Sequence, residues 1–198
     1  SEVYSVRHSV AALGIVSAKR PRREVVVSVG AGTTTFSAYS NSGAVSFYAF
    51  PFGGDVITER IAQFARVELG MQLGWGRCEQ VKRQHLTVSP HNSVGQRTWL
   101  SGKATVSGLP VRRRVDVTDF NQVVVREVRN LVEFLRATLH KHEHAGSELS
   151  VRVIGGGAGL DGLAQYLSRE LKVEVSKVAN HQTHIVENAA LLWQKPEY

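Results

Sequence analysis

Apolar and polar residues in the first quarter of the chain alternate between hydrophobic runs and turn-forming residues. Residues 25–29 are apolar except for Ser28, as in a buried strand. Residues 30–32 are Gly-Ala-Gly and require a turn, and residues 33–39 are rich in β-branched and aromatic types. After a second turn, residues 44–50 repeat the strand pattern. The pattern predicts an antiparallel meander of three strands.

Helical spacing dominates the middle of the chain. Ile57, Ile61 and Phe64 recur at helical intervals after Asp55, which is expected to cap a helix that runs to about residue 69. A short helix is expected near residues 77–84, and the alternation of residues 98–117 predicts a hairpin. From residue 118 onward one apolar stripe predicts a long helix. The stripe consists of Val124, Val128, Leu131, Leu135 and Leu139.

The last third of the chain alternates between short strand and helix patterns. Residues 149–154 and 173–178 are expected to be strands, and residues 160–171 and 186–193 to be helices. A glycine-rich loop, residues 155–159, separates the first of these strands from the first helix. Together with the meander, this order predicts an α/β fold in which helices pack on a mixed sheet.

Composition places the chain among soluble globular proteins. The length of 198 residues suits one domain with a sizeable insertion. No apolar run reaches the roughly 20 residues that span a bilayer. The single cysteine, Cys78, excludes an internal disulfide and is typical of a reducing compartment, so a cytoplasmic location is expected.

The net charge of +7 comes partly from two basic clusters. One surrounds Pro21, and the other is Arg112, Arg113 and Arg114. Clustered cations can bind nucleic acid or anionic lipid, or can simply be solvated loop edges. No aromatic residues are interleaved with them, as single-strand nucleic-acid platforms require. Nucleic acid is therefore an unlikely partner, and a membrane is expected only through another protein or these basic patches.

Two glycine-rich loops carry the candidate chemistry. In the first loop, at the tip of a hairpin, Gly30 and Gly32 let the backbone approach a ligand, and the hydroxyls of Thr33 and Thr34 can bind phosphate oxygens. The second loop, residues 155–159, is expected to precede a helix N-terminus, where unpaired amides favour a negative or polar ligand. A tight turn and close packing without a ligand explain either loop equally well.

Taken together and in order, these segments resemble the actin, Hsp70 and sugar-kinase superfamily. Residues 25–34 resemble its second phosphate motif, and Gly53-Gly54-Asp55 resembles the double glycine that opens the next helix in MreB and Hsp70. Residues 73–82, LGWGRCEQVK, resemble the MreB segment whose glutamate and lysine reach the ribose and base. Residues 101–118 resemble the insertion hairpin of MreB and magnetosome-filament actins. Residues 153–163 resemble the adenosine motif of MreB, FtsA and the magnetosome actins.

The resemblance covers nearly the whole chain and implies domain II of an actin-like protein. Residues 1–56 and 148–198 would form a ribonuclease-H-like subdomain, with a smaller α+β subdomain, residues 57–147, inserted into it. The strands at 25–29 and 149–154 would lie side by side and parallel, with both glycine loops leaving the same edge of the sheet, where ligands of open α/β sheets bind. The first phosphate motif of the family lies on domain I, which would be a missing partner.

By the same resemblance the chain contributes residues to a site for ATP or ADP. Those residues are Gly30, Gly32, Thr33, Thr34, Gly54, Glu79, Lys82, Gly155, Gly156, Gly157 and Ala158.

Two positions depart from the family pattern. An aspartate that helps to hold hydrated magnesium is replaced by Ser28, which cannot supply the charge that a hard dication prefers. An acidic residue that positions the attacking water is replaced by His8. A neutral histidine can orient water in principle. The changes nevertheless predict weakened or lost hydrolysis, weak nucleotide binding, doubtful magnesium binding and no catalytic residue.

Two functions remain open. The first is a cytoskeletal or scaffold protein with a degenerate nucleotide site, which associates head to tail into filaments or docks on a partner. The alternative is an active ATPase of the Hsp70, MreB or sugar-kinase kind whose adenosine half lies in this chain. No metal site is expected at the histidines of residues 140–144, and Trp75 and Trp99 are expected to pack rather than stack on a ligand.

Overall fold

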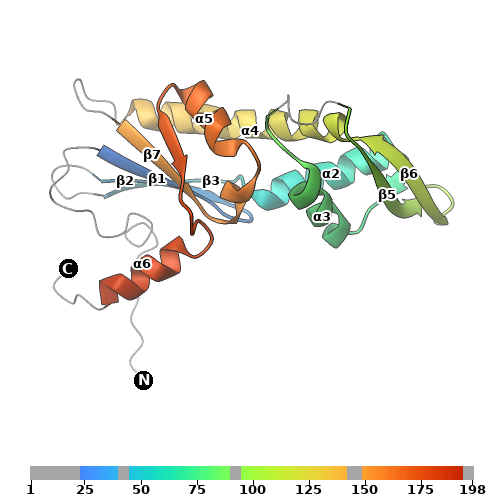
Figure 1. Cartoon of the computed structure of the whole chain (residues 1–198), viewed down its shortest axis with the longest axis horizontal. Helices are drawn as coiled ribbons and strands as arrows, with labels where there is room; N and C mark the ends of the chain where they lie inside the picture. The colour runs from blue at the N-terminus through green and yellow to red at the C-terminus, as the bar shows by residue number, and fades with distance from the viewer. Residues whose placement is uncertain (1–22, 40–44, 90–94, 142–148, 194–198) are drawn as a thin grey trace.

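A mixed five-stranded sheet organises one end of the molecule (Figure 1). The computed structural model describes residues 23–39, 45–89, 95–141 and 149–193. The strands β1 Arg23–Val29, β2 Thr34–Tyr39 and β3 Val45–Phe50 form the antiparallel meander that the sequence predicts. The strands β7 Leu149–Ile154 and β8 Glu174–Lys177 add in parallel on the other side of β1. The strand order is β3-β2-β1-β7-β8.

The central strand β1 is buried on both faces, which explains its nearly continuous apolar run. Val25 and Val27 face the main core, beneath the helices α4 Val117–His140 and α5 Leu163–Leu171 (Figure 1). Val26 belongs to a second apolar cluster on the opposite face, where Ile185 of helix α6 His184–Trp193 packs. Helices therefore flank the sheet on both sides.

The long helix α4 connects the two ends of the molecule (Figure 1). All five residues of its predicted apolar stripe are buried. The helix begins one residue earlier than predicted, because the Asp116 side chain caps it by accepting a hydrogen bond from the Thr118 amide at 2.9 Å. Phe134 stacks on Phe50 of β3, with ring centroids 4.7 Å apart, and so holds the helix on the sheet.

A second, three-stranded sheet lies at the other end (Figure 1). The predicted hairpin is present as β5 Arg97–Ala104 and β6 Pro110–Asp116. A two-residue strand that the sequence pattern did not indicate, β4 Met71–Gln72, pairs with β5. The helices α2 Gly54–Val67 and α3 Trp75–His85 connect this sheet to the first. The subdomain boundaries at 56/57 and 147/148 stay a prediction.

The expected cap of α2 is wrong. Gly53 occupies the N-cap position, and Asp55 lies inside the first turn without a capping hydrogen bond. Two carbonyl groups of the β1–β2 hairpin tip take over the capping role. The Gly54 amide donates to the Gly30 carbonyl at 3.0 Å, and the Asp55 amide donates to the Ala31 carbonyl at 2.8 Å. The first turn of α2 is therefore hydrogen-bonded to the hairpin tip.

The expected helix at residues 160–171 begins later than predicted. A short 3₁₀ turn, Gly156–Gly159, follows β7, and α5 starts only at Leu163. The break lies at Gly162, whose backbone is left-handed with φ +75°, a conformation that cannot continue a right-handed helix. The glycine loop therefore does not lead directly into the N-terminus of α5, in contrast to the prediction.

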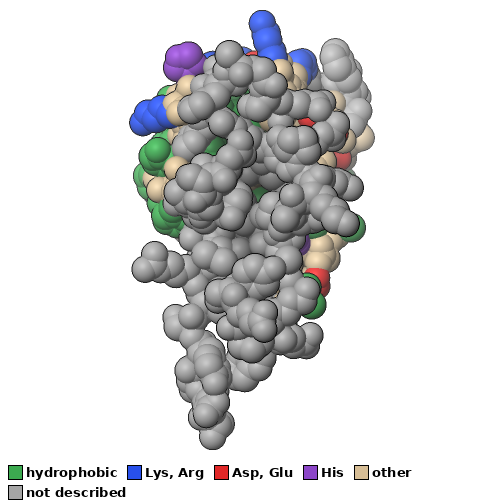
Figure 2. All heavy atoms as spheres, turned by 90° about the vertical axis from the view of Figure 1, so that its left-hand side faces the viewer, with side chains coloured by type: hydrophobic (Ala, Val, Ile, Leu, Met, Phe, Trp, Pro, Cys, Tyr) green, Lys and Arg blue, Asp and Glu red, His purple; other side chains and the backbone are tan. Residues whose placement is uncertain are grey.

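Trp75 and Trp99, which are expected from the sequence to pack rather than stack on a ligand, are 53% and 48% exposed, respectively. The Arg112 guanidinium lies over the Trp99 ring, 4.6 Å from its centroid. Seen from the end that carries the five-stranded sheet, cationic and histidine side chains of the described residues gather at the upper rim (Figure 2). None of the described helices is long and apolar enough to cross a membrane.

Candidate functional site

The two glycine loops leave the five-stranded sheet at the same edge. Ser28 of β1 pairs with Ile154 of β7 in a parallel register, so the residues that follow both strands emerge side by side. The packing between the loops is close. A Cβ atom on Gly155 would lie 2.4 Å from the Val29 carbonyl oxygen, and one on Gly157 would lie 2.3 Å from Val29 Cγ1. The predicted placement of the loops at one end of the sheet is confirmed.

A cavity of about 550 Å³ opens between these loops and the first turns of α2 and α3. Its volume is within the range of small-molecule and cofactor sites. The lining combines glycine backbone with both charged and apolar side chains. The residues that line it are Val29, Gly30, Ala31, Phe52, Gly54, Asp55, Ile57, Trp75, Glu79, Lys82, Arg83, Leu86, Val128, Gly156, Gly157, Gly159, Leu160, Asp161, Leu163 and Gln182.

Six of the eleven predicted site residues line this cavity: Gly30, Gly54, Glu79, Lys82, Gly156 and Gly157. They come from separate segments of the chain, so the fold brings together residues that are more than a hundred positions apart.

The other five do not line the cavity: Gly32, Thr33, Thr34, Gly155 and Ala158. Thr34 is fully buried, and its hydroxyl donates a hydrogen bond to the Phe52 carbonyl at 2.8 Å. That bond fixes the hairpin tip to the segment before α2. Its side chain therefore supports the loop rather than facing the cavity.

The ammonium group of Lys82 is bound by three acceptors near the N-terminus of α2. This group donates to the Gly54 carbonyl and to the Thr58 hydroxyl, each at 2.8 Å. It also forms an ion pair with the Glu79 carboxylate at 2.5 Å. A Cβ atom on Gly54 would lie 3.1 Å from the Lys82 Nζ atom, so the glycine leaves room for the ammonium group.

Glu79 is ionised, and its negative charge is balanced by the positive charge of Lys82. Burial by itself would raise the pKa of Glu79, but hydrogen bonds from Lys82 and Thr58, and the charges of Lys82 and Arg83, lower that pKa below its ordinary value. Glu79 and Lys82 therefore act as a fixed pair with no net charge. The three N–H groups of Lys82 are already taken by Gly54, Thr58 and Glu79, so the pair offers a ligand only the carboxylate acceptor of Glu79, which suits a sugar hydroxyl.

His181 braces the second glycine loop, a role that sequence reasoning missed. Its Nδ1 atom lies 2.9 Å from the Gly155 carbonyl oxygen, and its own carbonyl accepts a hydrogen bond from the Gly155 amide at 2.6 Å. Because a carbonyl can only accept, Nδ1 must carry the proton. No spacing in the sequence links residue 181 to residue 155, because the contact exists only once β8 has paired with β7.

Ser28 is nearly buried in β1, with 6% of its surface exposed, and brings no charge to the sheet edge. Three carboxylates line the cavity from other segments, those of Asp55, Glu79 and Asp161. Within residues 23–39, 45–89, 95–141 and 149–193, no group of three or more histidine, cysteine or acidic side chains could hold a metal ion. His8 lies outside the described residues.

The family model for MreB/Mbl protein matches residues 2–197 of the chain. The chain belongs to the MreB/Mbl family. Among curated relatives, the cell shape-determining protein Mbl of Bacillus subtilis is 30% identical over 179 residues, which is 86% of this chain and 53% of Mbl. The cell shape-determining protein MreB of Escherichia coli is 25% identical over 155 residues, or 76% of this chain and 44% of that protein. This MreB/Mbl chain therefore spans about half the length of the curated relatives it matches.

Solved structures show the same fold. MreB5 of Spiroplasma citri, crystallised with AMPPNP, superposes with a TM-score of 0.81 at 19% identity and covers 96% of this chain and 58% of its own. The MamK double helical filament superposes with a TM-score of 0.69 at 20% identity, over 87% of this chain and 54% of the MamK chain. The α/β, actin-like fold that the sequence predicts is confirmed.

Proposed function

We propose that this MreB/Mbl chain is domain II of a bacterial, cytoplasmic, actin-like scaffold protein and supplies the adenosine side of a weak nucleotide site. The observation that carries the proposal is the convergence of the two glycine loops with Glu79 and Lys82 around one cavity. The relatives support it, since Mbl is a cell shape-determining protein and MreB5 of Spiroplasma citri binds AMPPNP.

The cavity is suited to a nucleoside. Gly156 and Gly157 carry no side chains, so the backbone of the second loop can approach a flat base or a ribose closely. The Glu79 carboxylate would accept a hydrogen bond from a ribose hydroxyl, while its ion pair with Lys82 holds it in place. Gly30 also lines the cavity, at the tip of the adjacent hairpin, where the phosphates would pass.

We expect nucleotide affinity to be weak and insensitive to magnesium. This chain supplies one wall of the cleft, so only part of a nucleotide would be removed from water. Ser28 cannot anchor a hydrated dication, because hard cations prefer charged oxygen ligands. For the same reason we expect no ATP hydrolysis above background.

Calorimetric titration with ATP and ADP, with and without magnesium, tests the proposal. Gly156→Asp should abolish binding, because it places bulk and negative charge where ribose or phosphate would lie. Gly156 is exposed, and a Cβ atom on it would meet no heavy atom within 4 Å, so the fold should tolerate the change.

Gly76→Asp is the matched control. Gly76 is equally exposed and uncrowded, lies on α3, and does not line the cavity. If Gly76→Asp weakens binding as much as Gly156→Asp does, the cavity is not the site. A submicromolar, magnesium-dependent affinity would contradict the degenerate site and favour the alternative, an active ATPase completed by a second half-cleft.

Self-association is the second part of the proposal. The MamK filament has the same fold, and head-to-tail contacts between identical subunits produce open filaments. Sedimentation of the chain with and without nucleotide, followed by electron microscopy of the pellet, would reveal polymers. A chain that stays monomeric at every concentration, alone and with ATP, would instead support docking on a different scaffold protein.

A further inference from the structure

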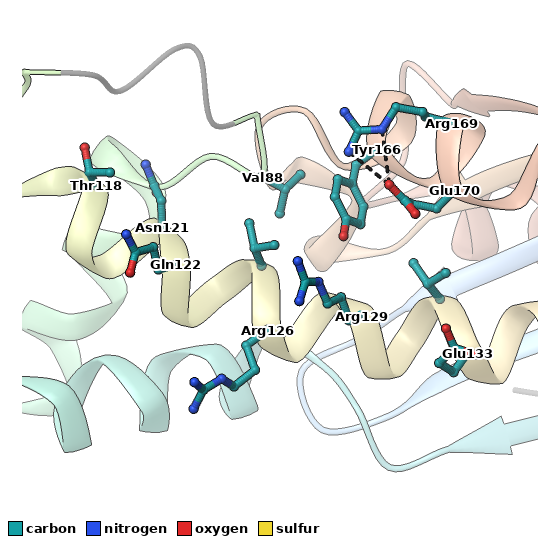
Figure 3. A pocket seen from close by; sticks show the side chains of 12 residues that line it. Val88, Thr118, Asn121, Gln122, Arg126, Arg129, Glu133, Tyr166, Arg169 and Glu170 are labelled. Carbon is teal, nitrogen blue, oxygen red and sulfur yellow. Dashed lines mark hydrogen bonds and ion pairs between the residues drawn. The ribbon is translucent and has the colours of Figure 1, made fainter.

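A groove runs along α4 on the side of α5, away from the nucleotide cavity (Figure 3). Its volume is about 730 Å³, and none of its lining residues lines the nucleotide cavity. The residues that line it are Val88, Thr118, Asn121, Gln122, Val125, Arg126, Arg129, Val132, Glu133, Tyr166, Arg169 and Glu170.

One buried donor in this groove has no partner. The Asn121 side chain is 3% exposed, and its Oδ1 atom accepts a hydrogen bond from the Thr87 amide at 3.0 Å. Because an amide N–H can only donate, the orientation of the carboxamide is fixed and Nδ2 is the free end. Within the described part of the chain, Nδ2 has no hydrogen-bond partner. A buried donor without a partner is costly, so this atom favours a ligand that brings an acceptor.

The groove also carries positive charge that its own acids do not neutralise. Glu133 is paired with Arg136 at 2.6 Å, outside the groove lining, and Glu170 is paired with Arg169 at 3.0 Å. Among the residues that the structure describes, no ion pair involves Arg126 or Arg129. These two guanidinium groups therefore remain available to an anionic ligand.

The arrangement of the side chains favours an elongated ligand. Arg129 rises from α4 on the side of Tyr166, whose ring is covered by the Arg169 guanidinium at 5.1 Å (Figure 3). The lining residues on α4 run from Thr118 to Glu133, which corresponds to about 22 Å at the rise of an α-helix. An extended peptide of about seven residues has this length.

Apolar side chains are interleaved with the cations along the groove. Val125 and Val132 come from α4, and Val88 comes from the segment that follows α3. Val132 and Val88 are already buried, whereas Val125 is partly exposed. A small free anion would leave Val125 in water, but a peptide that alternates acidic and apolar residues would cover it and pair with the arginines at the same time.

We propose that the groove between α4 and α5 is a docking site for an extended acidic segment of a partner protein. Carboxylates of the segment pair with Arg129 and Arg126, and an apolar side chain between them covers Val125. A main-chain carbonyl or carboxylate accepts from Asn121 Nδ2. This inference is independent of the nucleotide site, because the two share no lining residue.

Fluorescence anisotropy with a labelled octapeptide of alternating glutamate and leucine tests the docking site. The matched probe is the octapeptide of alternating lysine and leucine. We expect the acidic peptide to bind and the basic peptide not to bind. Arg129→Glu should weaken binding by about tenfold or more, because it replaces an attraction with a repulsion of similar size.

Two further variants separate the groove from general charge. Lys103→Glu makes the same change of charge at an exposed residue on β5, outside the groove, and should change the affinity by no more than about twofold. Asn121→Asp keeps an acceptor for the Thr87 amide but replaces the free donor with a carboxylate oxygen that repels an acidic peptide, and should weaken binding by about fivefold or more. Circular dichroism melting curves identify variants that fail to fold.

The proposal is overturned if neither peptide binds, or if Arg129→Glu and Lys103→Glu weaken binding equally. It is also overturned if phosphatidylglycerol vesicles bind in an Arg129-dependent manner while the acidic peptide does not, because the occupant would then be a lipid surface. Increased protection of α4 and α5 from hydrogen exchange in the presence of the acidic peptide would support the site directly, even if Asn121→Asp does not fold.

Discussion

Adjacent glycines of the second loop should respond in opposite ways to replacement by alanine. Gly155 has φ +86°, and a Cβ atom there would lie 2.4 Å from the Val29 carbonyl oxygen. Gly156 has no positive φ and no heavy atom within 4 Å of the same position. The contrast comes from β1, which lies against one residue of the loop and not against the next.

The expected magnitudes follow from these distances. For Gly155→Ala, a left-handed backbone costs about 1 kcal/mol, and relieving the overlap with β1 costs about 2 kcal/mol more. Gly156→Ala should be neutral or should stabilise the fold by about 0.5 kcal/mol, because it restricts the unfolded chain. The two variants should therefore differ by about 3 kcal/mol in the free energy of unfolding.

Urea unfolding followed by far-ultraviolet circular dichroism measures this difference. With a slope of about 2 kcal/mol per molar urea, the midpoints of the two variants should differ by about 1.5 M. Equal slopes would confirm that both variants expose the same surface. Midpoints within about 0.3 M of each other would refute the reasoning, since the loop could then not be held against β1 as described.

Substitutions at two other positions test the proposed nucleotide site. The pKa of Glu79 is lowered in the folded state, so its charge stabilises the fold above its ordinary pKa and this contribution is lost as the pH falls through the folded value. Glu79→Gln should thus lower the urea midpoint near pH 7 and have little effect near pH 3, and an equal loss at both pH values would contradict the ion pair. His181→Ala should weaken ATP binding by loosening Gly155. His181→Gln can still donate to the same carbonyl, so this variant should bind ATP more tightly than the alanine variant. Similar affinities for both would exclude a positioning role for His181.

Local patterns were sufficient to predict the elements in which apolar residues recur at the spacing of a helix or form the continuous run of a buried strand. The stripe from Val124 to Leu139 predicted α4, because residues on one face of a helix recur at a fixed spacing wherever the helix lies. The apolar run in β1 and the turns after it predicted the meander. Collinear motifs then indicated the parallel pairing of β1 with β7, which the register confirms.

Predictions failed where backbone groups from another part of the chain determined the local structure. Asp55 is a good capping residue, but the carbonyls of Gly30 and Ala31 already satisfy the first amides of α2. The strand β4 has two residues and no periodicity of its own, and exists because β5 lies beside it.

The sequence by itself determined the family, the order of the elements and the glycine loops, because these depend on residue types at short range. The tertiary structure alone decided which of the predicted residues share a cavity. It also decided that Lys82 is held by Gly54 and Thr58, and that His181 holds Gly155. Each of these contacts joins residues that are far apart in the chain. Their geometry is set by the pairing of strands and the packing of helices, so no local pattern can encode it.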